Sequence, residues 1–404
     1  MEKKDTPNAA KLPAPSAAKL PAQKRVYFDW AAAAPFFEAK PCAHFGNPSS
    51  LHSEGRSAKE ALESSRKRVG AVLNVPPETL YFTSGGTESN SIALFSNLTR
   101  LITSGSYKGR VISSLAEHAS VREAMITIEK MGKATGSIKV DSAGKVTPEL
   151  LEKVLTQYTD VRFAAIMSVN NETGTITDIA SLKKIIKKQT GAPIHLHCDL
   201  VQAVGKIPFD ISGWEIDSAS ISAHKIGGPR GIGLLYSRKP LTEVFYSGGG
   251  QENGVRGGTE NVQGATALAD CLEEVINAKD FELKFLKAKA RWEKLITALL
   301  GIKRCTIIPK ERAASDDGFS PYILQAAFND IPGEVMARAL DDLGFAVSTG
   351  SACSSSSPER PVLSAMGVGE KLRIEGIRIS QGDATTDEDI DALLSAINEV
   401  LKFL

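Results

Sequence analysis

From Val26 onward, short apolar runs alternate with segments of helical periodicity, and this alternation constrains the fold more than any other feature of the sequence. Buried strands are predicted at Leu80–Thr83, Phe163–Val169, His195–Asp199, Ser218–Ser222 and Gly231–Tyr236, and helices at Gly86–Leu94 and Leu182–Gln189. Parallel neighbours in a sheet need long crossovers, which are usually helical. The pattern therefore predicts an α/β protein with a mostly parallel sheet of at least six strands.

The C-terminal third has a different pattern, in which helical stretches are longer. Helices are predicted at Ala265–Leu300, Gly333–Leu343 and from Asp387, and strands at Ile323–Asn329 and Gly376–Ser380. Thr386 can cap the last helix together with Asp389, three residues further on. We predict a large domain over residues 46–263, a smaller α+β domain over residues 264–404, and an N-terminal segment over residues 26–45 that packs with the smaller domain.

The first 25 residues are built from Lys, Ala, Pro and Ser, and they contain the hexad AAKLPA twice, at Ala9–Ala14 and Ala17–Ala22. Such a segment has little to bury, so nothing offsets the entropy cost of ordering it. We predict a disordered tail, and a transit peptide is the alternative.

Charge and cysteine content exclude several classes of protein. The chain has 48 Lys and Arg against 47 Asp and Glu, so it lacks the basic excess needed to coat nucleic acid or an anionic membrane. No apolar run approaches the roughly 20 residues that span a bilayer. The five cysteines show no CxxC spacing, which disfavours a disulfide framework or a zinc ribbon and indicates a reducing, cytoplasmic setting; they are Cys42, Cys198, Cys271, Cys305 and Cys353.

Two glycine-rich turns follow predicted strands. Gly85 and Gly86 end the first strand and open a helix, whose free N–H groups suit a phosphate, although a simple turn is the commoner use of such glycines. Lys225 ends another apolar strand directly before Gly227. A desolvated lysine is the usual amine for condensation with an aldehyde, whereas the alternative is a lysine that extends to solvent.

The segment His195-Leu-His-Cys-Asp199 permits two interpretations. On a strand, His195, His197 and Asp199 point to one face and could bind a metal. Inside a covered parallel sheet, however, a histidine pair more often serves packing and hydrogen bonding. Asp199, followed by Gln202, then lies at the carboxyl end of the strand, where α/β folds bind ligands. A carboxylate there could keep a heteroaromatic nitrogen protonated.

Cys353 lies in a run of small polar residues from Val347 to Ser357, which cannot form a core. Such a loop is predicted to be exposed, and an accessible thiol suits a sulfur carrier or a covalent nucleophile. The alternative is an incidental surface thiol. Cys271 and Cys305 lie in helix and strand patterns and are predicted to be buried.

Taken in order, several motifs resemble those of the cysteine desulfurases in the class V (fold type I) aminotransferase family. The resemblance runs from about Val26 to Leu404, and the loop that carries Cys353 resembles the group I branch. The motifs are Gly46-Asn-Pro-Ser-Ser-Leu-His52, Thr83-Ser-Gly-Gly-Thr-Glu-Ser89, Glu117-His118, Val169-Asn-Asn-Glu172, His197-Cys-Asp-Leu-Val-Gln202, Ser222-Ala-His-Lys225, Gly257-Gly-Thr259, Ser351-Ala-Cys353 and Ile377-Arg-Ile-Ser380.

The resemblance implies a fold type I transferase that depends on pyridoxal 5′-phosphate, with a seven-stranded, mostly parallel sheet. It implies that Lys225 condenses with the cofactor aldehyde and that Asp199 pairs with the ring nitrogen. Gln202 would contact the phenolic oxygen, and His118 would stack on the ring. The phosphate ligands would be Gly86, Thr87, Ser222 and His224, with Thr259 reaching the cofactor of a partner subunit in a homodimer with shared sites. Asn171 and Arg378 would hold the substrate.

The implied reaction converts L-cysteine to L-alanine and leaves sulfur on Cys353 as a persulfide, with His118 as the candidate acceptor of the thiol proton. The sulfur would then pass to an acceptor protein, such as an iron–sulfur scaffold or a thiolation enzyme. The rival interpretations are a selenocysteine lyase or another enzyme on the same scaffold, a metal enzyme built on the histidine pair, and a non-catalytic interaction module.

Three features depart from the family pattern, and the first is the tail before Val26, which is not part of that pattern. The stretch from Asp29 to Gly46 is shorter than in the family and has alanines where threonines are common. The sequence also ends at Leu404, directly after the last predicted helix, without the extension that housekeeping members use to dock an iron–sulfur scaffold.

Overall fold

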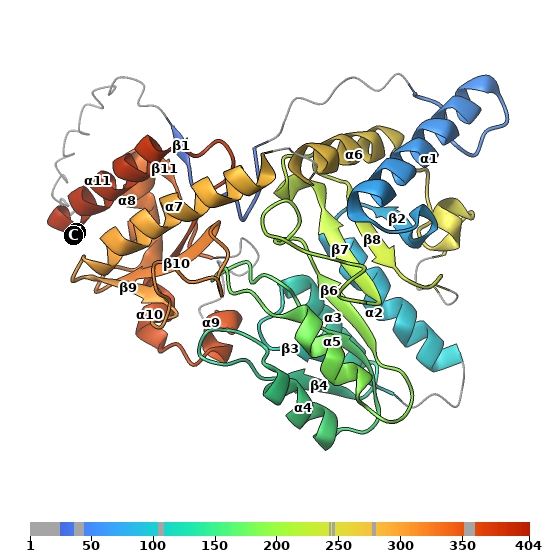
Figure 1. Ribbon diagram of the computed structural model, residues 1–404, viewed down its shortest axis with the longest axis horizontal. Coiled ribbons are helices and arrows are strands. Elements are labelled where there is room, and N and C mark those ends of the chain that lie inside the picture. Colours follow the sequence, from blue (N-terminus) through green and yellow to red (C-terminus); the bar gives the residue numbers. More distant parts are fainter. Residues whose placement is uncertain are drawn as a thin grey trace, which may run out of the picture.

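The elements of the chain form two groups, which Figure 1 shows side by side. The computed structural model describes residues 25–35, 44–103, 109–241, 244, 247–276, 280–350 and 360–404. A large sheet with its helices forms one group, and the C-terminal elements form the other (Figure 1). Among the described helices, none is both long enough and apolar enough to cross a membrane.

The large sheet has seven strands, and the prediction of a mostly parallel sheet is confirmed. Only β8 runs antiparallel to its neighbours β2 and β7, while the other pairs are parallel. In spatial order the strands are β2 (Leu80–Thr83), β8 (Gly233–Ser237), β7 (Ser218–Ser222), β6 (His195–Asp199), β5 (Val161–Ala165), β3 (Arg110–Ser114) and β4 (Thr135–Ile138).

Helices cover both faces of this sheet, because successive side chains of each strand point to opposite faces. Phe82 and Ile112 contribute to the core under α1 (Ser53–Leu73), α4 (Pro148–Gln157), α5 (Ile179–Lys187) and α6 (Val262–Ile276). Tyr81 and Val111, their neighbours in sequence, pack in a second core with α2 (Gly86–Thr103) and α3 (Ala119–Lys130). The result is a three-layer α/β sandwich in which strand ends meet helix starts.

The C-terminal group is built on a three-stranded antiparallel sheet. Its order is β12 (Gly376–Ser380), β10 (Ile323–Phe328) and β9 (Cys305–Ile308), and α7 (Phe281–Leu300), α8 (Gly333–Asp342) and α11 (Asp387–Phe403) pack around it (Figure 1). Two shorter helices, α9 (Pro361–Ala365) and α10 (Glu370–Glu375), precede β12. The predicted capping of α11 by Thr386 and Asp389 is confirmed, since each side chain accepts from the other's backbone N–H.

The N-terminal segment joins the C-terminal group. β1 (Val26–Tyr27) pairs in parallel with β11 (Phe345–Ala346), and Phe28 is buried in the same core as Trp292. The next residues, Asp29 to Ala34, then reach the carboxyl edge of the large sheet, where Ala34 N donates to His224 O at 2.9 Å. The proposed division of the chain into domains stays a prediction.

Two predicted elements are longer than those in the structure. The single helix expected over Ala265–Leu300 is wrong, because α6 ends at Ile276 and α7 begins at Phe281. The two helices serve different cores: Leu268 of α6 packs in the core with α1, whereas Leu295 of α7 packs in the C-terminal core. The strand expected over Phe163–Val169 ends at Ala165 as β5.

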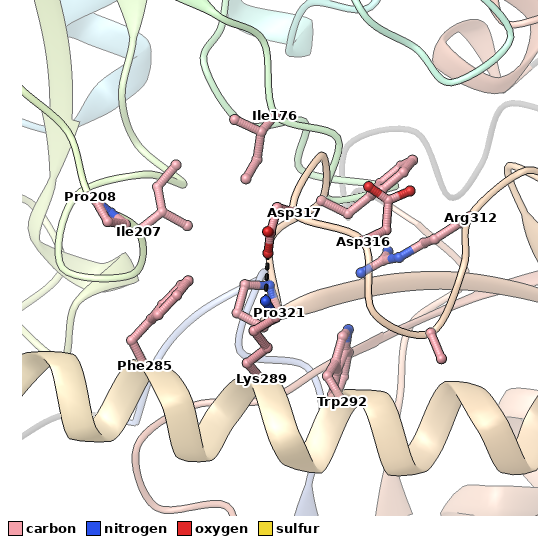
Figure 2. A pocket seen from close by; sticks show the side chains of 12 residues that line it. Ile176, Ile207, Pro208, Phe285, Lys289, Trp292, Arg312, Asp316, Asp317 and Pro321 are labelled. Atoms are coloured by element: carbon pink, nitrogen blue, oxygen red, sulfur yellow. Dashed lines mark hydrogen bonds and ion pairs between the residues drawn. The ribbon is translucent and has the colours of Figure 1, made fainter.

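A cavity of about 270 Å³ lies at the junction of the two groups. Figure 2 shows Phe285, Lys289 and Trp292 rising from α7, with Phe285 on the side of Ile207 and Pro208 of the large-sheet group and Lys289 pointing to Asp317. Its lining is mainly apolar, and the charged Lys289 Nζ is held by Asp317 Oδ1 at 2.5 Å (Figure 2). None of the site residues predicted from the sequence lines it, so this cavity is not the predicted site.

A buried ion pair fastens the segment before Thr259 to the large sheet. Glu252 accepts both Arg66 Nη1 and Nη2, at 2.8 and 2.9 Å, and its Oε2 also accepts Phe82 N at 2.8 Å. Both side chains are buried. Glu252 and Asn253 have left-handed backbone with φ of 48° and 55°, so tertiary contacts must hold this turn in place.

We expect Glu252→Ala to lower the free energy of unfolding by about 3 kcal/mol, because the buried Arg66 guanidinium keeps only the half-exposed Glu63 carboxylate, 3.2 Å from its Nε, as a charged partner. Urea denaturation followed by circular dichroism measures the loss. The double variant Arg66→Met/Glu252→Leu removes both charges and should recover most of it. A loss below about 1 kcal/mol in Glu252→Ala would contradict this account.

Candidate active site

A cavity of about 230 Å³ opens at the carboxyl ends of β6 and β7, where ligands bind in α/β folds. The start of α2, the start of α3 and the segment at Ala31 and Ala32 complete its wall together with β12. The structure brings most of the predicted site residues together around it; these are Gly86, Thr87, His118, Asn171, Asp199, Gln202, Ser222, His224, Lys225 and Arg378.

One end of the cavity is lined by the N-terminus of α2. Gly86 has no room for a side chain, because a Cβ there would lie 2.7 Å from Val201 Cγ2. Ser222 Oγ and His224 Nδ1 are 2.8 Å apart beside it. Burial, followed by repulsion from Lys225, lowers the pKa of His224 to about 4, so this imidazole is neutral at pH 7. Helix N–H groups, a hydroxyl and an imidazole form a suitable site for a phosphate.

Lys225 lies on the short turn that follows β7. Its Nζ donates to Ala31 O at 2.6 Å and to Ala32 O at 2.8 Å. Both acceptors belong to the N-terminal segment, so the segment after β1 helps to define the position of this amine. The cavity therefore contains a lysine amine held by neutral carbonyl oxygens, within a partly enclosed pocket.

A hydrogen-bonded chain fixes the Asp199 carboxylate. Asn90 Nδ2 donates to Asp199 Oδ2 at 2.9 Å, and Val201 N donates to Oδ1 at 2.9 Å. Asn90 Oδ1 in turn lies 2.9 Å from His197 Nε2. Burial lowers the pKa of His197 to about 3, so the neutral ring donates through Nε2. These hydrogen bonds orient the Asp199 carboxylate at the cavity, and His197 serves to hold Asn90 in place.

The histidine pair on β6 has contacts that differ from those of a metal site. His195 Nε2 and His197 Nδ1 both lie 2.7 Å from Ser218 Oγ, and His195 stacks on Phe163 with ring centroids 4.9 Å apart. In the part of the chain that the structure describes, no three acidic, histidine or cysteine side chains come together as metal ligands would.

His118 caps α3 with its ring. Ser120 N donates to His118 Nδ1 at 3.1 Å, and Ser120 Oγ lies 2.9 Å from the same atom. The accepting Nδ1 leaves the ring proton on Nε2 when the imidazole is neutral. Burial lowers the pKa of His118, with Asp199 opposing that change. A neutral imidazole beside Lys225 can accept or return a proton near pH 7.

Arg378, on β12, is buried at the cavity wall. Its Nη1 donates to Asn171 O at 2.9 Å and its Nη2 to Asp29 Oδ1 at 2.8 Å. Arg378 Nε and Asn171 Oδ1 are buried without a hydrogen-bond partner. Buried polar atoms without a hydrogen-bond partner destabilise the fold unless a ligand binds them. A carboxylate that binds the edge of the guanidinium group would accept a hydrogen bond from Nε.

Glu117 precedes His118 and is fully buried. Ser114 Oγ donates to Glu117 Oε1 at 2.6 Å and Met167 N donates to it at 2.8 Å, whereas Oε2 is buried without a partner. Burial, reinforced by the charge of Asp199, raises the pKa of Glu117 to about 8 despite the two hydrogen bonds. The side chain is therefore a neutral acid at pH 7.

We expect this raised pKa to make the cofactor-free protein less stable as pH rises. Above pH 4.5 the unfolded carboxyl ionises while the folded one stays neutral, so stability is lost progressively up to about pH 8. Relative to Glu117→Gln, the parent should lose on the order of 4 kcal/mol between pH 5 and pH 8. Urea denaturation at several pH values measures the difference, with Glu60→Gln on the exposed face of α1 as control. A pH-independent difference would contradict the buried neutral acid.

Two predicted site residues remain to be placed, Thr259 and Cys353. Thr259 is exposed and lies outside the lining. Cys353, the predicted nucleophile, lies outside the residues that the structure describes. Sequence reasoning in turn missed Asn90, Asp29 and the carbonyls of Ala31 and Ala32. Asn90 carries a sequence signal, since it lies one helical turn after Gly86, whereas nothing in the sequence joins Asp29 to Arg378.

Comparison with known proteins gives a consistent result over nearly the whole chain. Residues 26–393 match the family described as aminotransferase class-V. The chain is 37% identical over 398 residues to cysteine desulfurase IscS of Dictyoglomus turgidum, covering 95% of this chain and 96% of that protein.

Two solved structures agree with the same comparison. A NifS-like protein superposes with a TM-score of 0.83 at 34% identity, covering 94% of this chain and 100% of the other. A structure of SspA in complex with cysteine gives a TM-score of 0.73 at 27% identity, covering 89% and 99%.

Proposed function

The chain belongs to the class-V aminotransferase family, and from this membership and its site we infer that it is a cysteine desulfurase, which converts L-cysteine to L-alanine and retains the sulfur. One observation carries the proposal: the Lys225 amine, the Asp199 carboxylate, the N-terminus of α2 and the Arg378 guanidinium line a single cavity. An amine, an acid, a phosphate site and a carboxylate site are the four parts that amino-acid chemistry with pyridoxal phosphate needs.

The residues present fit pyridoxal 5′-phosphate. The α2 N-terminus at Gly86 and Thr87, with Ser222 and His224, would hold its phosphate. Asp199, already oriented by Asn90, would pair with the ring nitrogen, and Lys225 would bind the aldehyde carbon. Gln202 and His118 would contact the ring. Bound in this way, the cofactor supplies a carbonyl that condenses with amino groups and a ring that accepts electron density.

The chain's own residues then bind and orient L-cysteine. Arg378 receives the substrate carboxylate on its unpartnered Nε, while Asp29 and Asn171 O keep the guanidinium plane fixed. Asn171 supplies the unpartnered Oδ1 beside it. Lys225 Nζ is the base that removes the Cα proton and later returns a proton. Because the bound substrate and Lys225 are held close together, this transfer needs no bimolecular encounter.

Sulfur transfer requires a thiolate. Cys353 loses its thiol proton to His118 and attacks the sulfur of L-cysteine. A sulfur–sulfur bond forms, the carbon–sulfur bond of the substrate breaks, and its electron pair stays on the carbon side, where a proton completes L-alanine. The protein keeps the sulfur as a Cys353 persulfide, and no external oxidant or reductant is needed up to this point.

Partners and compartment complete the proposal. Exposed Thr259 follows the turn that Glu252 and Arg66 fasten, which suits a residue that reaches the site of a second copy in a homodimer. The persulfide would be delivered to an acceptor protein, such as an iron–sulfur scaffold or a thiolation enzyme. A mechanism built on a reduced thiol suits the cytoplasm.

The absorption spectrum of the protein loaded with pyridoxal phosphate, before and after addition of L-cysteine, tests this proposal. A yellow band that shifts on addition, with alanine and sulfide produced under reducing conditions, is the expected result. L-serine, which offers the same amino and carboxyl groups without sulfur, is the matched control and should yield no alanine. A protein that stays colourless, or that forms neither product, would overturn the proposal.

A further inference from the structure

Behind the active-site cavity, Lys206 and Gln202 form a hydrogen-bonded relay. Both lie on the turn that follows β6, four residues apart, and their exposed fractions are only 8% and 3%. Lys206 Nζ donates to Gln202 Oε1 at 2.6 Å, and Gln202 Nε2 donates to Ala31 O at 2.9 Å. Ala31 O is also an acceptor for Lys225 Nζ. The relay therefore ends at the amine that the proposed function uses.

The relay decides which way the Gln202 amide points. An amide carries an acceptor and a donor of nearly equal size, so only its partners distinguish its two orientations. In its protonated form, Lys206 carries an ammonium group, which has donors and no acceptor. It can therefore bond only to Gln202 Oε1, and the NH₂ group of Gln202 is left to face Ala31 and the cavity.

The cost of burying Lys206 is large for a purely structural residue. Among the described residues, no carboxylate lies within ion-pair distance of its Nζ, which donates to the neutral Gln202 amide oxygen. Burial lowers its pKa to about 7, and repulsion from Lys225 and Arg378 acts in the same direction, while Asp383 opposes it. A neutral, apolar side chain would fill the same space at less cost.

We propose that Lys206 is a positioning residue of the cofactor site, which holds the Gln202 amide so that its NH₂ group donates toward the ring oxygen of pyridoxal phosphate. The inference rests on the proposed function, in which Gln202 contacts that oxygen. It adds a residue that touches neither substrate nor cofactor and acts through Gln202.

A donor against the ring oxygen has a consequence that can be measured. It draws negative charge from the oxygen, so the nearby nitrogen supplied by Lys225 holds its proton less tightly. Loss of the donor should move the pH midpoint of the visible spectrum upward. Other charged or titratable groups also face this nitrogen and contribute to the midpoint; they are Lys206, His118, His224, Asp199, Arg378 and Asp383.

A double-mutant cycle separates action through Gln202 from a direct effect of the Lys206 charge. The parent, Lys206→Met, Gln202→Leu and the double variant are loaded with pyridoxal phosphate, and their visible spectra are titrated without L-cysteine. We expect each single variant to raise the midpoint by about one pH unit, and the double variant to add nothing further. Retention of the cofactor on dialysis should fall in the same three variants.

Lys183→Met is the matched control, because Lys183 is also a buried lysine but pairs with Asp217, at 2.5 Å, away from the cavity. It should leave the midpoint unchanged even if it destabilises the fold. A parent midpoint retained in Lys206→Met, or a full further shift in the double variant, would overturn the role of Lys206 alone. A parent without any visible band would instead overturn the cofactor assignment, and with it this inference.

Discussion

Replacing Lys225 with alanine is expected to abolish the release of alanine and sulfide from L-cysteine. Lys225 is the amine that lines the cavity beside Asp199, and its Nζ is positioned by the carbonyls of Ala31 and Ala32. Its loss removes both the covalent attachment of pyridoxal phosphate and the base that moves the Cα proton. Loss of the base alone costs roughly 10²–10⁴-fold in rate. An assay of alanine and sulfide, alongside the visible spectrum, measures both effects.

Lys289→Ala is the control for this experiment, since Lys289 is a lysine that lines the cavity at the junction of the two groups and is held there by Asp317 (Figure 2). It should leave turnover and the spectrum unchanged. If Lys225→Ala still turned over L-cysteine, the amine would have to come from elsewhere, and the assignment of the active site to the carboxyl ends of β6 and β7 would fail. Loss of turnover in Lys289→Ala would instead place the active site in the cavity at the junction of the two groups of elements.

The alternation of strands and helices could be predicted because it reflects burial within short segments. His195–Asp199 and Ser218–Ser222 became β6 and β7 with the predicted bounds. The antiparallel direction of β8 could not be predicted, since an apolar run has the same pattern in either direction. The break between α6 and α7 was also missed, because both helices have apolar faces and only tertiary packing assigns them to different cores.

The candidate site also has features that could be predicted from the sequence and features that could not. Asp199 and Lys225 follow strands, so their presence at one edge of a parallel sheet could be expected from the sequence. The contacts that orient them join distant segments: Asn90 bonds Asp199 across 109 residues, and Asp29 bonds Arg378 across 349 residues. Pairs so far apart in the chain cannot be predicted from local sequence patterns. Lys206 was overlooked because a lysine after a strand is usually solvent-exposed, whereas the turn here buries it.

Cysteine burial bears on which thiol can act as the nucleophile. Burial raises the pKa of Cys271 to about 11 and that of Cys305 to about 12, and it raises the pKa of Cys198 as well. Thiols with such pKa values hold almost no thiolate at pH 7, and the thiolate is the attacking species. The cysteines that remain, Cys42 and Cys353, lie outside the described residues, and only Cys353 falls within a family motif.

We therefore expect Cys353→Ala to bind pyridoxal phosphate normally and to show the spectral shift on addition of L-cysteine. Its rate of alanine formation should nevertheless fall by more than roughly 10³-fold, which is the scale for removal of a catalytic nucleophile. With L-cysteine in only slight excess over the sites and no other thiol, the parent should give an initial burst of alanine stoichiometric with its sites, because each Cys353 takes up one sulfur atom faster than the remaining thiol can remove it. Cys353→Ala should give no burst. Cys42→Ala, the matched control, should keep the full burst. A burst retained in Cys353→Ala would contradict the assignment, and one lost in Cys42→Ala would move the sulfur to that residue.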